Sequence, residues 1–415
     1  MSHQYEVIII GAGPSGLAAA RSLLEEGVKD VLLLEREQEA GGVPRHCRHP
    51  TFGIQTFHRP MQGHRWAQRI LAMVQGQYEI RTGTTVIQIH PGGEIDVSSD
   101  RGLETLSARR VIIATGVRET PRHPRLVSGL RPQGILTAGA LQQFIYLRKL
   151  KPGLHPVIIG SELVSFSAIW TLRNAGIKTL ALIDEHSRPL AFRLSTLYAK
   201  LLGVKVYLGA HITRINGAER VESIEFREAN GQTRQLACDS VIFTGRFTGE
   251  YTLIRKSHLT FEPDSGRPLF DQYGRCSDPA YYVVGNMTHP ADMGDQCYQE
   301  GLRIGRYVAG SLRQRQQNQH EVGVTLEETF RLAAPNVLTL TEHMQSVTLN
   351  VRVNHFYHGE IVVRCGESII YQGKHRCLPE RRILLKDIPL SRIKAGETLT
   401  VATQQGRTDP CTMSR

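Results

Sequence analysis

A glycine turn between an apolar strand and a helix opens the chain and constrains its fold more than any other feature. Tyr5-Glu-Val-Ile-Ile-Ile10 has the length of a buried strand, and Gly11-Ala-Gly-Pro-Ser-Gly16 follows it. An Ala- and Leu-rich helical stretch then leads to a second apolar strand, Val31-Leu-Leu-Leu-Glu35, which ends in an acid. Strand, glycine turn, helix and acid-ended strand within about 30 residues are typical of a dinucleotide-binding fold.

The same order of features recurs further along the chain. Pro156-Val-Ile-Ile-Gly160 matches the first strand and turn, and residues 164–175 form a second helical stretch. The segment Gly176-Ile-Lys-Thr-Leu-Ala-Leu-Ile-Asp184 then parallels residues 27–35, and its acid follows the first glycine at the same interval. This shared spacing predicts two nucleotide-type folds in one chain.

The C-terminal part has a different character. Residues 313–320 are polar and of low complexity, as linkers often are. Beyond about residue 325, runs rich in β-branched residues alternate with Gly and Asn turns, at 347–353, 360–364, 369–371 and 398–402. We expect a small antiparallel β domain here.

Composition narrows the functional classes. The 415 residues carry 50 Lys+Arg against 39 Asp+Glu, a formal charge of +11 that suits an anionic partner. No recognition helix, zinc finger or RNP-type aromatic strand is present, so nucleic acid is not an expected partner. A membrane-spanning helix needs an apolar run of about 18 residues, and no run in the sequence approaches that length. The N-terminus lacks the basic and then apolar segments of a secretory signal, so none is expected.

The seven cysteines are scattered and include no Cys-x-x-Cys pair. Such usage suits a reducing cytoplasm, where we expect the protein, and argues against a disulfide framework. It also argues against a zinc ribbon or a ferredoxin-like cluster, so we predict no metal site.

The first turn has an explicit chemistry. Gly11 permits the tight turn, Gly13 lets backbone approach a pyrophosphate, and Gly16 lets the helix pack on the strand. The helix N-terminus, with Pro14 and Ser15, offers N–H groups and a positive dipole end to phosphates. Glu35 is expected to accept a hydrogen bond from a ribose hydroxyl.

Further segments carry a family resemblance. Gly11–Gly16, Glu35-Arg36, Gly41-Gly42, Ala114-Thr115-Gly116 and Val284-Gly285-Asn286 resemble the FAD-binding fingerprints of the pyridine nucleotide–disulfide oxidoreductase superfamily, over about residues 4–312. The resemblance implies that the first fold binds FAD, that an inserted fold binds NAD(P)H, and that the chain then returns to complete the FAD domain. It also implies that Gly42, Thr115, Gly116 and Gly285 lie at the FAD. Asn286 stands where the family usually has an Asp for the ribityl chain.

The expected fold class is therefore α/β, with two Rossmann-like domains, of FAD and NAD(P) type, and a small β-rich C-terminal domain. The expected boundaries are 1–125 and 241–315 for the two parts of the FAD domain, 126–240 for the inserted domain, 316–324 for a linker and 325–415 for the β-rich domain. The resemblance also predicts a helix from about Gly301 whose N-terminus points at the isoalloxazine ring, where its dipole would stabilise reduced flavin.

A narrower resemblance concerns Gly41-Gly-Val-Pro-Arg-His-Cys-Arg-His49 with Phe52-Gly53. These residues are similar to a bacterial branch of flavoprotein subunits from multi-component dehydrogenases acting on amines, opines, hydroxyproline, glycine or glycerol phosphate. Some members carry a C-terminal [2Fe–2S] module. Because Cys365, Cys377 and Cys411 lack its spacing, the resemblance implies partner dehydrogenase or iron–sulfur subunits.

The second turn departs from the pattern. In Gly160-Ser-Glu-Leu-Val-Ser165, Glu162 stands where the first copy has Gly13, and its carboxylate would repel a pyrophosphate. Asp184 would favour NAD over NADP. Two interpretations stay open: NAD(H) binding at Gly160 and Asp184, or a second fold that serves as a scaffold while electrons pass to a protein partner.

Cys47 and the basic residues also have two interpretations each. Arg45, His46, Arg48 and His49 could stabilise a reactive Cys47 thiolate, but we favour a plain packing residue. Disulfide reduction is disfavoured because no second cysteine lies near Cys47 in the sequence. Arginines cluster at 45–69 and 109–131, either as a field for an anionic substrate or as a solvated or docking face.

The sequence thus predicts an FAD-dependent oxidoreductase. Its flavin would accept a hydride from a small amino- or hydroxy-acid-like substrate, or relay electrons within a multi-subunit dehydrogenase. The alternatives are an NAD(P)H-dependent flavin reductase or oxidase without a redox disulfide, and a non-catalytic assembly subunit with structural FAD. No catalytic residue can be named from the sequence.

Overall fold

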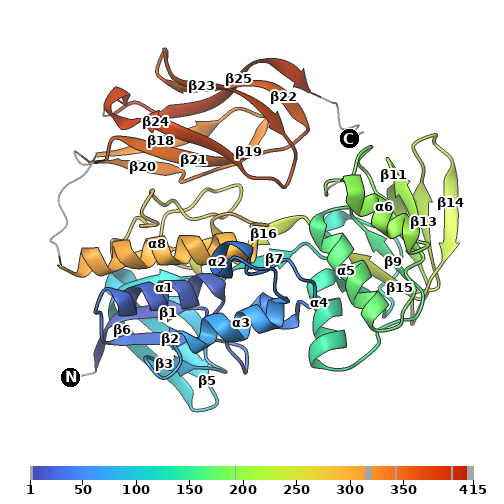
Figure 1. The fold of residues 1–415 in the computed structure, drawn as a ribbon, viewed down its shortest axis with the longest axis horizontal. Helices are drawn as coiled ribbons and strands as arrows, with labels where there is room; N and C mark the ends of the chain where they lie inside the picture. The colour runs from blue at the N-terminus through green and yellow to red at the C-terminus, as the bar shows by residue number, and fades with distance from the viewer. Residues whose placement is uncertain (1–2, 192, 314–319, 342–343, 394–395, 409–415) are drawn as a thin grey trace.

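The computed structural model describes residues 3–191, 193–313, 320–341, 344–393 and 396–408. Figure 1 shows two α/β units side by side and an all-β unit stacked over α8 of the first. The predicted fold class, two Rossmann-like units and a β-rich C-terminal region, is confirmed.

The first unit is built on a largely parallel sheet. The order β3-β2-β1-β6 continues to β17, which pairs with the C-terminal end of β6, while β4 and β5 add an antiparallel meander to its N-terminal half. The strands are β1 (Gln4–Ile10), β2 (Val31–Leu34), β3 (Glu79–Arg81), β4 (Thr85–Ile89), β5 (Glu94–Ser99), β6 (Gly102–Ile113) and β17 (Tyr281–Val283). The helices are α1 (Pro14–Glu25), α2 (Ile54–Phe57), α3 (Gly63–Ala72), α7 (Thr252–Arg255) and α8 (Gly294–Arg313).

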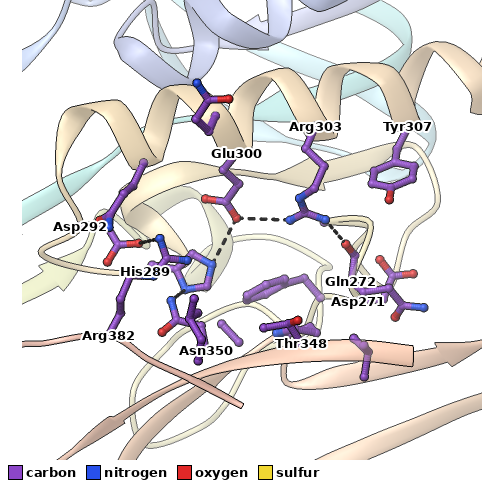
Figure 2. Close-up of a pocket in the computed structure, with 18 of the residues that line it drawn as sticks. Asp271, Gln272, His289, Asp292, Glu300, Arg303, Tyr307, Thr348, Asn350 and Arg382 are labelled. Atoms are coloured by element: carbon purple, nitrogen blue, oxygen red, sulfur yellow. Dashed lines mark hydrogen bonds and ion pairs between the residues drawn. The ribbon is translucent and has the colours of Figure 1, made fainter. Parts of the chain in front are cut away.

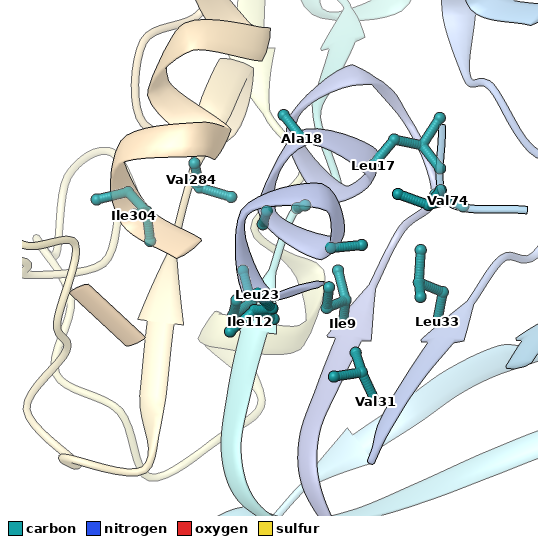
Figure 3. Close-up of a cluster of buried hydrophobic side chains, with 14 of the residues drawn as sticks. Ile9, Leu17, Ala18, Leu23, Val31, Leu33, Val74, Ile112, Val284 and Ile304 are labelled. Atoms are coloured by element: carbon teal, nitrogen blue, oxygen red, sulfur yellow. The ribbon is translucent and has the colours of Figure 1, made fainter. Parts of the chain in front are cut away.

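Helices α1 and α8 pack on this sheet and on each other. Ile9, Leu33 and Ile112 are fully buried beneath them, each contributing about 1.5–3 kcal/mol of hydrophobic stabilisation (Figure 3). A Cβ at Gly301 would lie 2.3 Å from the Ser15 carbonyl oxygen, so only glycine permits this helix contact. Helix α8 therefore lies against the first turn of α1.

The second unit repeats the plan. Its parallel sheet has the order β11-β10-β9-β15-β8, and β12, β13 and β14 form a small antiparallel sheet beside it. The strands are β8 (Ile135–Thr137), β9 (Pro156–Ile159), β10 (Ala181–Asp184), β11 (Lys205–Leu208), β12 (His211–Asn216), β13 (Ser223–Arg227), β14 (Thr233–Ala237) and β15 (Ser240–Phe243). The helices are α4 (Ala138–Gln142), α5 (Leu163–Asn174) and α6 (Arg193–Leu201).

The chain crosses between the two units twice, through the antiparallel pair β7 (Val117–Glu119) and β16 (Phe247–Gly249). Strand β15 is hydrogen-bonded to β9 and β8, so the second sheet continues to Phe243. The expected end of the inserted domain at residue 240 is therefore too early.

The C-terminal unit consists of two facing sheets, β20-β18-β25-β22-β23 and β19-β21-β24, around a common apolar core. Its strands are β18 (His320–Leu326), β19 (Phe330–Ala334), β20 (Val337–Leu340), β21 (Ser346–Val353), β22 (Tyr357–Cys365), β23 (Ser368–Cys377), β24 (Ile383–Pro389) and β25 (Leu399–Thr408). Two expectations are corrected. The unit begins within the expected linker, because β18 starts at His320, while 316–319 lie outside the described residues. It is not wholly antiparallel, because β18 and β25 run parallel.

Candidate functional site

The first glycine turn has three glycines with different duties. Gly11 has a φ of +102°, and an added Cβ would lie 2.6 Å from the Ala114 carbonyl oxygen. A Cβ at Gly16 would lie 2.0 Å from the Gly11 carbonyl oxygen. At Gly13, by contrast, the nearest atom to an added Cβ is Gly42 Cα at 3.9 Å. The fold itself requires Gly11 and Gly16, whereas Gly13 leaves space that a ligand can occupy.

Helix α1 begins at this turn without a side-chain cap. Gly13 is its N-cap, Pro14 is its first residue, and no side chain hydrogen-bonds the first-turn N–H groups. Uncapped N–H groups at a helix N-terminus bind phosphate oxygens well. The turn therefore fits the pyrophosphate of a dinucleotide.

Glu35 lies at the end of β2 beside the turn. It is buried, and its two oxygens accept the backbone N–H groups of Ala12 and Glu37, each at 3.0 Å. Burial raises the pKa of this carboxyl above its ordinary value. Each oxygen retains a lone pair for a ribose hydroxyl. The neighbouring Arg36 is exposed.

Gly42, Thr115 and Gly116 differ in how closely they approach the turn. A Cβ at Gly42 would lie 2.9 Å from Gly13 Cα, so this residue lies against the turn itself. The Thr115 hydroxyl donates to the Glu250 carbonyl at 3.1 Å, and the Gly116 carbonyl accepts the Glu250 N–H. Thr115 and Gly116 thus anchor the crossing to the second unit, a duty that the sequence does not reveal.

Gly285 and Asn286 complete the first site from the far end of the chain. Gly285 has a φ of +80°, and an added Cβ would lie 2.0 Å from Ser15 Oγ. The Asn286 amide accepts the Asp292 N–H at 2.9 Å and donates to the Asp292 carbonyl at 3.2 Å. One amide N–H and one lone pair remain for ligand hydroxyls. The structure therefore brings together the predicted residues Ser15 and Gly285.

Helix α8 begins at Gly294, earlier than the predicted start at Gly301. The carboxylate of Asp295, in its first turn, accepts the N–H groups of Gly53 at 2.9 Å and Thr56 at 3.0 Å. Sequence reasoning missed Asp295, because its partners are distant in the chain. This contact sets the α8 N-terminus beside the segment that follows Gly41-Gly42.

The second turn differs from the first. The Glu162 carboxylate receives hydrogen bonds from the Ser165 hydroxyl at 3.0 Å and the Thr244 hydroxyl at 2.9 Å. Added Cβ atoms at Gly160 and Gly245 would lie 2.5 and 2.0 Å from its oxygens. Burial, together with the nearby charge of Asp184, raises the pKa of Glu162 to about 7. The Glu162 side chain thus fills the space between these glycines.

Asp184 lies at the end of β10, as predicted, but its carboxylate is engaged. Asp184 Oδ1 lies 2.7 Å from both the backbone nitrogen and Nδ1 of His186. The structure brings Gly160 and Asp184 to one edge of the sheet, yet Glu162 takes the approach that Gly13 leaves open in the first turn. As arranged, the second turn does not fit a dinucleotide pyrophosphate.

The described cysteines offer no redox pair. Five of them, at 47, 238, 276, 297 and 377, are buried free thiols, Cys365 is buried beside Glu397, and Cys411 lies outside the described residues. Burial, with a smaller effect of Glu119, raises the pKa of Cys47 to about 12. Burial also lowers the pKa values of His46 and His49 to about 4, so both imidazoles are neutral at pH 7. Cys47 is therefore a packing residue rather than a stabilised thiolate.

Most arginines of the second basic cluster bind protein groups. Arg122 donates to backbone carbonyls of residues 127–130, and Arg125 to those of Thr244 and Gly245. Arg118 forms an ion pair with Glu250. These contacts favour a structural role for the arginines over a positive field that attracts substrate.

Within the described residues, no cluster of three His, Cys, Asp or Glu side chains could hold a metal ion. None of the described helices has the length and apolar character that a membrane span requires.

Comparison with known proteins supports the interpretation of the first turn. The family model of pyridine nucleotide-disulphide oxidoreductases matches residues 5–319, ending just before β18. Dihydrolipoyl dehydrogenase from Rhizobium etli is 23% identical over 364 residues, which cover 75% of this chain and 73% of the relative. An opine oxidase subunit from Agrobacterium tumefaciens is 25% identical over 317 residues, which cover 69% of this chain and 62% of that relative.

A solved structure shares the fold. Thioredoxin reductase from T. acidophilum aligns with a TM-score of 0.65 at 20% identity, over 75% of this chain and 99% of that protein. Enzymes of the matched family bind FAD and use NAD(P)H, and the first turn fits the FAD pyrophosphate. The chain therefore belongs to the pyridine nucleotide–disulphide oxidoreductase family and is an FAD-dependent oxidoreductase.

Proposed function

We propose that the protein is a dehydrogenase whose flavin accepts a hydride from a small amino- or hydroxy-acid-like substrate. In a multi-subunit enzyme, the same flavin would instead relay the electrons that another subunit takes from the substrate. The contrast between the two turns carries this proposal. Gly13 leaves space for a pyrophosphate, whereas Glu162 fills the equivalent space in the second turn. Cys47, the cysteine that follows the first turn in the sequence, is a buried free thiol without a redox partner, which disfavours disulfide reduction.

The residues of the first unit have defined tasks in this proposal. Gly13 and the uncapped start of α1 hold the FAD pyrophosphate, and Glu35 and Asn286 accept hydrogen bonds from hydroxyl groups of FAD. The dipole of α8 favours negative charge at its N-terminus, beside Gly53. FAD, when bound, supplies the hydride-accepting N5 atom.

Partners form part of the proposal. Similarity to the opine oxidase subunit supports a role as the flavoprotein component of a larger enzyme, with partner dehydrogenase or iron–sulfur subunits. The chain spans about three-fifths of that relative, so its activity is not transferred to this protein as a whole. The buried free thiols at 47, 238, 276, 297 and 377 support a cytoplasmic location.

Anaerobic bleaching of the flavin tests the proposal. The purified, FAD-reconstituted protein is mixed with NADH, NADPH and a panel of amino and hydroxy acids, and absorbance near the flavin maximum is followed. We expect one class of acid to bleach the flavin faster than either nicotinamide. Rapid bleaching by NADH alone would contradict the proposal. A protein that keeps FAD but is reduced by none of these would favour the assembly subunit with structural FAD.

A second candidate, an NAD(P)H-dependent flavin reductase or oxidase, is favoured by one observation. The pKa of Glu162 is about 7, so about half of the molecules carry a neutral carboxyl at that pH. Protonation removes the repulsion of a pyrophosphate but leaves the bulk of the side chain. If this candidate is correct, NADH bleaches the flavin faster as the pH falls below 7, and Glu162→Gly removes that dependence.

A further inference from the structure

A cavity lies between helix α8 and the C-terminal β unit. Its volume is about 410 Å³. Figure 2 shows Glu300, Arg303 and Tyr307 reaching into it from α8, opposite Asn350 and Arg382 of the β unit. The cavity is therefore a joint product of the first and third units.

The carboxylates of the cavity are already paired with cations. Asp292 forms ion pairs with both Arg352 and Arg382. Glu300 lies 3.2 Å from His289 Nε2 and 3.8 Å from Arg303. Although burial alone would raise its pKa, these groups and the Gly285 N–H hold the pKa of Glu300 below its ordinary value. The third carboxylate of the lining, Asp271, lies 3.2 Å from Arg275. Because two guanidiniums share the one carboxylate of Asp292, positive charge is locally in excess at that wall.

Two polar atoms at the cavity wall have no partner within the described residues. Asn350 is 3% exposed, and its Oδ1 accepts no hydrogen bond, although its Nδ2 lies 2.9 Å from His289 Nδ1. The Nε–H of Arg382 is likewise buried and makes no hydrogen bond. Buried polar groups are normally satisfied, so the residues of this wall leave one acceptor and one donor without a partner.

The cavity is connected to the FAD turn. The second oxygen of Glu300, Oε2, accepts the backbone N–H of Gly285 at 3.1 Å. Gly285 in turn lies against Ser15 at the start of α1. A ligand that changes the position of Glu300 therefore acts directly on the loop expected to face the flavin ribityl chain.

We propose that this cavity binds a small organic carboxylate that also carries a hydrogen-bond donor. Its carboxylate bonds Arg382 and Arg303, which project from opposite walls, and its amino or hydroxyl group bonds Asn350 Oδ1. Phe270, Tyr307 and Met344 supply apolar surface for a carbon chain. The site binds its ligand whether or not the flavin oxidises that molecule, so this inference is independent of the proposed reaction.

The test is calorimetric titration of the full-length, oxidised, FAD-bound protein with L-glutamate, 2-hydroxyglutarate, neutral glutaramide and inorganic phosphate. A second readout is the perturbation of the flavin absorbance spectrum. We expect both acids to bind and to shift the spectrum, and glutaramide to do neither. Equal binding of glutaramide, tighter binding of inorganic phosphate, or no heat with either acid would overturn the proposal.

Variants locate the site. Arg382→Gln and Arg303→Gln should each weaken binding roughly tenfold, because each removes a charge-assisted hydrogen bond. Arg306→Gln, on the same helix but outside the cavity lining, is the matched control and should bind as the unmodified protein does. If Arg382→Gln does not fold, Arg303→Gln still decides, since its side chain is 46% exposed. Equal weakening by Arg306→Gln would show that the heat comes from another site.

Discussion

Ser15 and Gly285 are in contact across the first unit, at a point where a Cβ on Gly285 would lie 2.0 Å from Ser15 Oγ. The two halves of the FAD-binding unit therefore meet at a position that admits no side chain. We predict that Gly285→Ala lowers both the melting temperature and FAD occupancy, because alanine adds this overlap to a strained φ of +80°. Thermal melts and the ratio of flavin to protein absorbance measure the two effects.

Gly310→Ala is the control for this change. It lies on α8 with no atom within 4 Å of an added Cβ, so alanine should stabilise the helix by about 0.5–1 kcal/mol and leave FAD bound. Unchanged FAD binding in Gly285→Ala would mean that the loop can move away from Ser15.

Gly13→Ala separates ligand binding from folding. Since the nearest atom to the new methyl group is 3.9 Å away, the FAD-free variant should melt at the temperature of the FAD-free unmodified protein. Its methyl group would occupy the pyrophosphate approach, so FAD affinity should fall by roughly tenfold or more, about 1.4 kcal/mol. Gly16→Ala, with an overlap at 2.0 Å, should lose stability as well. Full FAD affinity in Gly13→Ala would place the pyrophosphate elsewhere.

Glu162 makes stability depend on pH. Because its folded pKa is raised to about 7, its contribution to stability is full below the unfolded pKa near 4.5 and is lost as the pH rises through 7. Glu162→Gln stays neutral, so it should gain on the order of 2 kcal/mol over the unmodified protein between pH 5 and pH 8.5. Denaturant unfolding at both pH values gives the difference. Glu219→Gln, at an exposed position, is the control and should show no such gain. If the free energy of unfolding changed equally with pH in the unmodified protein and both variants, Glu162 would not be a buried carboxyl with a raised pKa.

Cys47 should be inert in the folded protein. With a pKa of about 12 and a side chain 4% exposed, its thiol is neither ionised nor accessible at pH 8. We expect iodoacetamide to modify Cys47 only after denaturation, as peptide mass spectrometry would show. Cys47→Ala should retain flavin reduction by whichever donor proves active. Rapid alkylation of the native protein would restore the reactive-thiol interpretation.

The sequence predicted the parts of the fold that local patterns encode. The first glycine turn, the second copy and the C-terminal strands follow from apolar periodicity and glycine placement. The start of α8 was missed because residues 290–294 contain proline and glycine and show no helical period. The start of β18 was missed because His320 continues a polar run, and its strand pairing comes from distant β20 and β25.

For the candidate site, the sequence predicts individual residues but not the contacts between them. Gly11, Gly13, Gly16 and Glu35 carry their chemistry in their spacing. The fate of Glu162 depends on Thr244, which reaches it only after the chain has completed the second sheet. The cavity at Glu300 depends on Asn350 and Arg382, from a unit whose sequence carries no recognised motif. Such long-range contacts leave no local signal.

The pairing of β7 with β16 also determines how the protein can be divided. Glu119 is opposite Phe247, so the chain enters and leaves the second unit at adjacent points. Insertions with adjacent ends are tolerated because the host can close without them. Residues 120–246 thus form an insertion whose two ends are adjacent, and we expect the first unit to tolerate its removal. A short turn joining β7 to β16 would leave the FAD-type half and the β unit as a continuous chain.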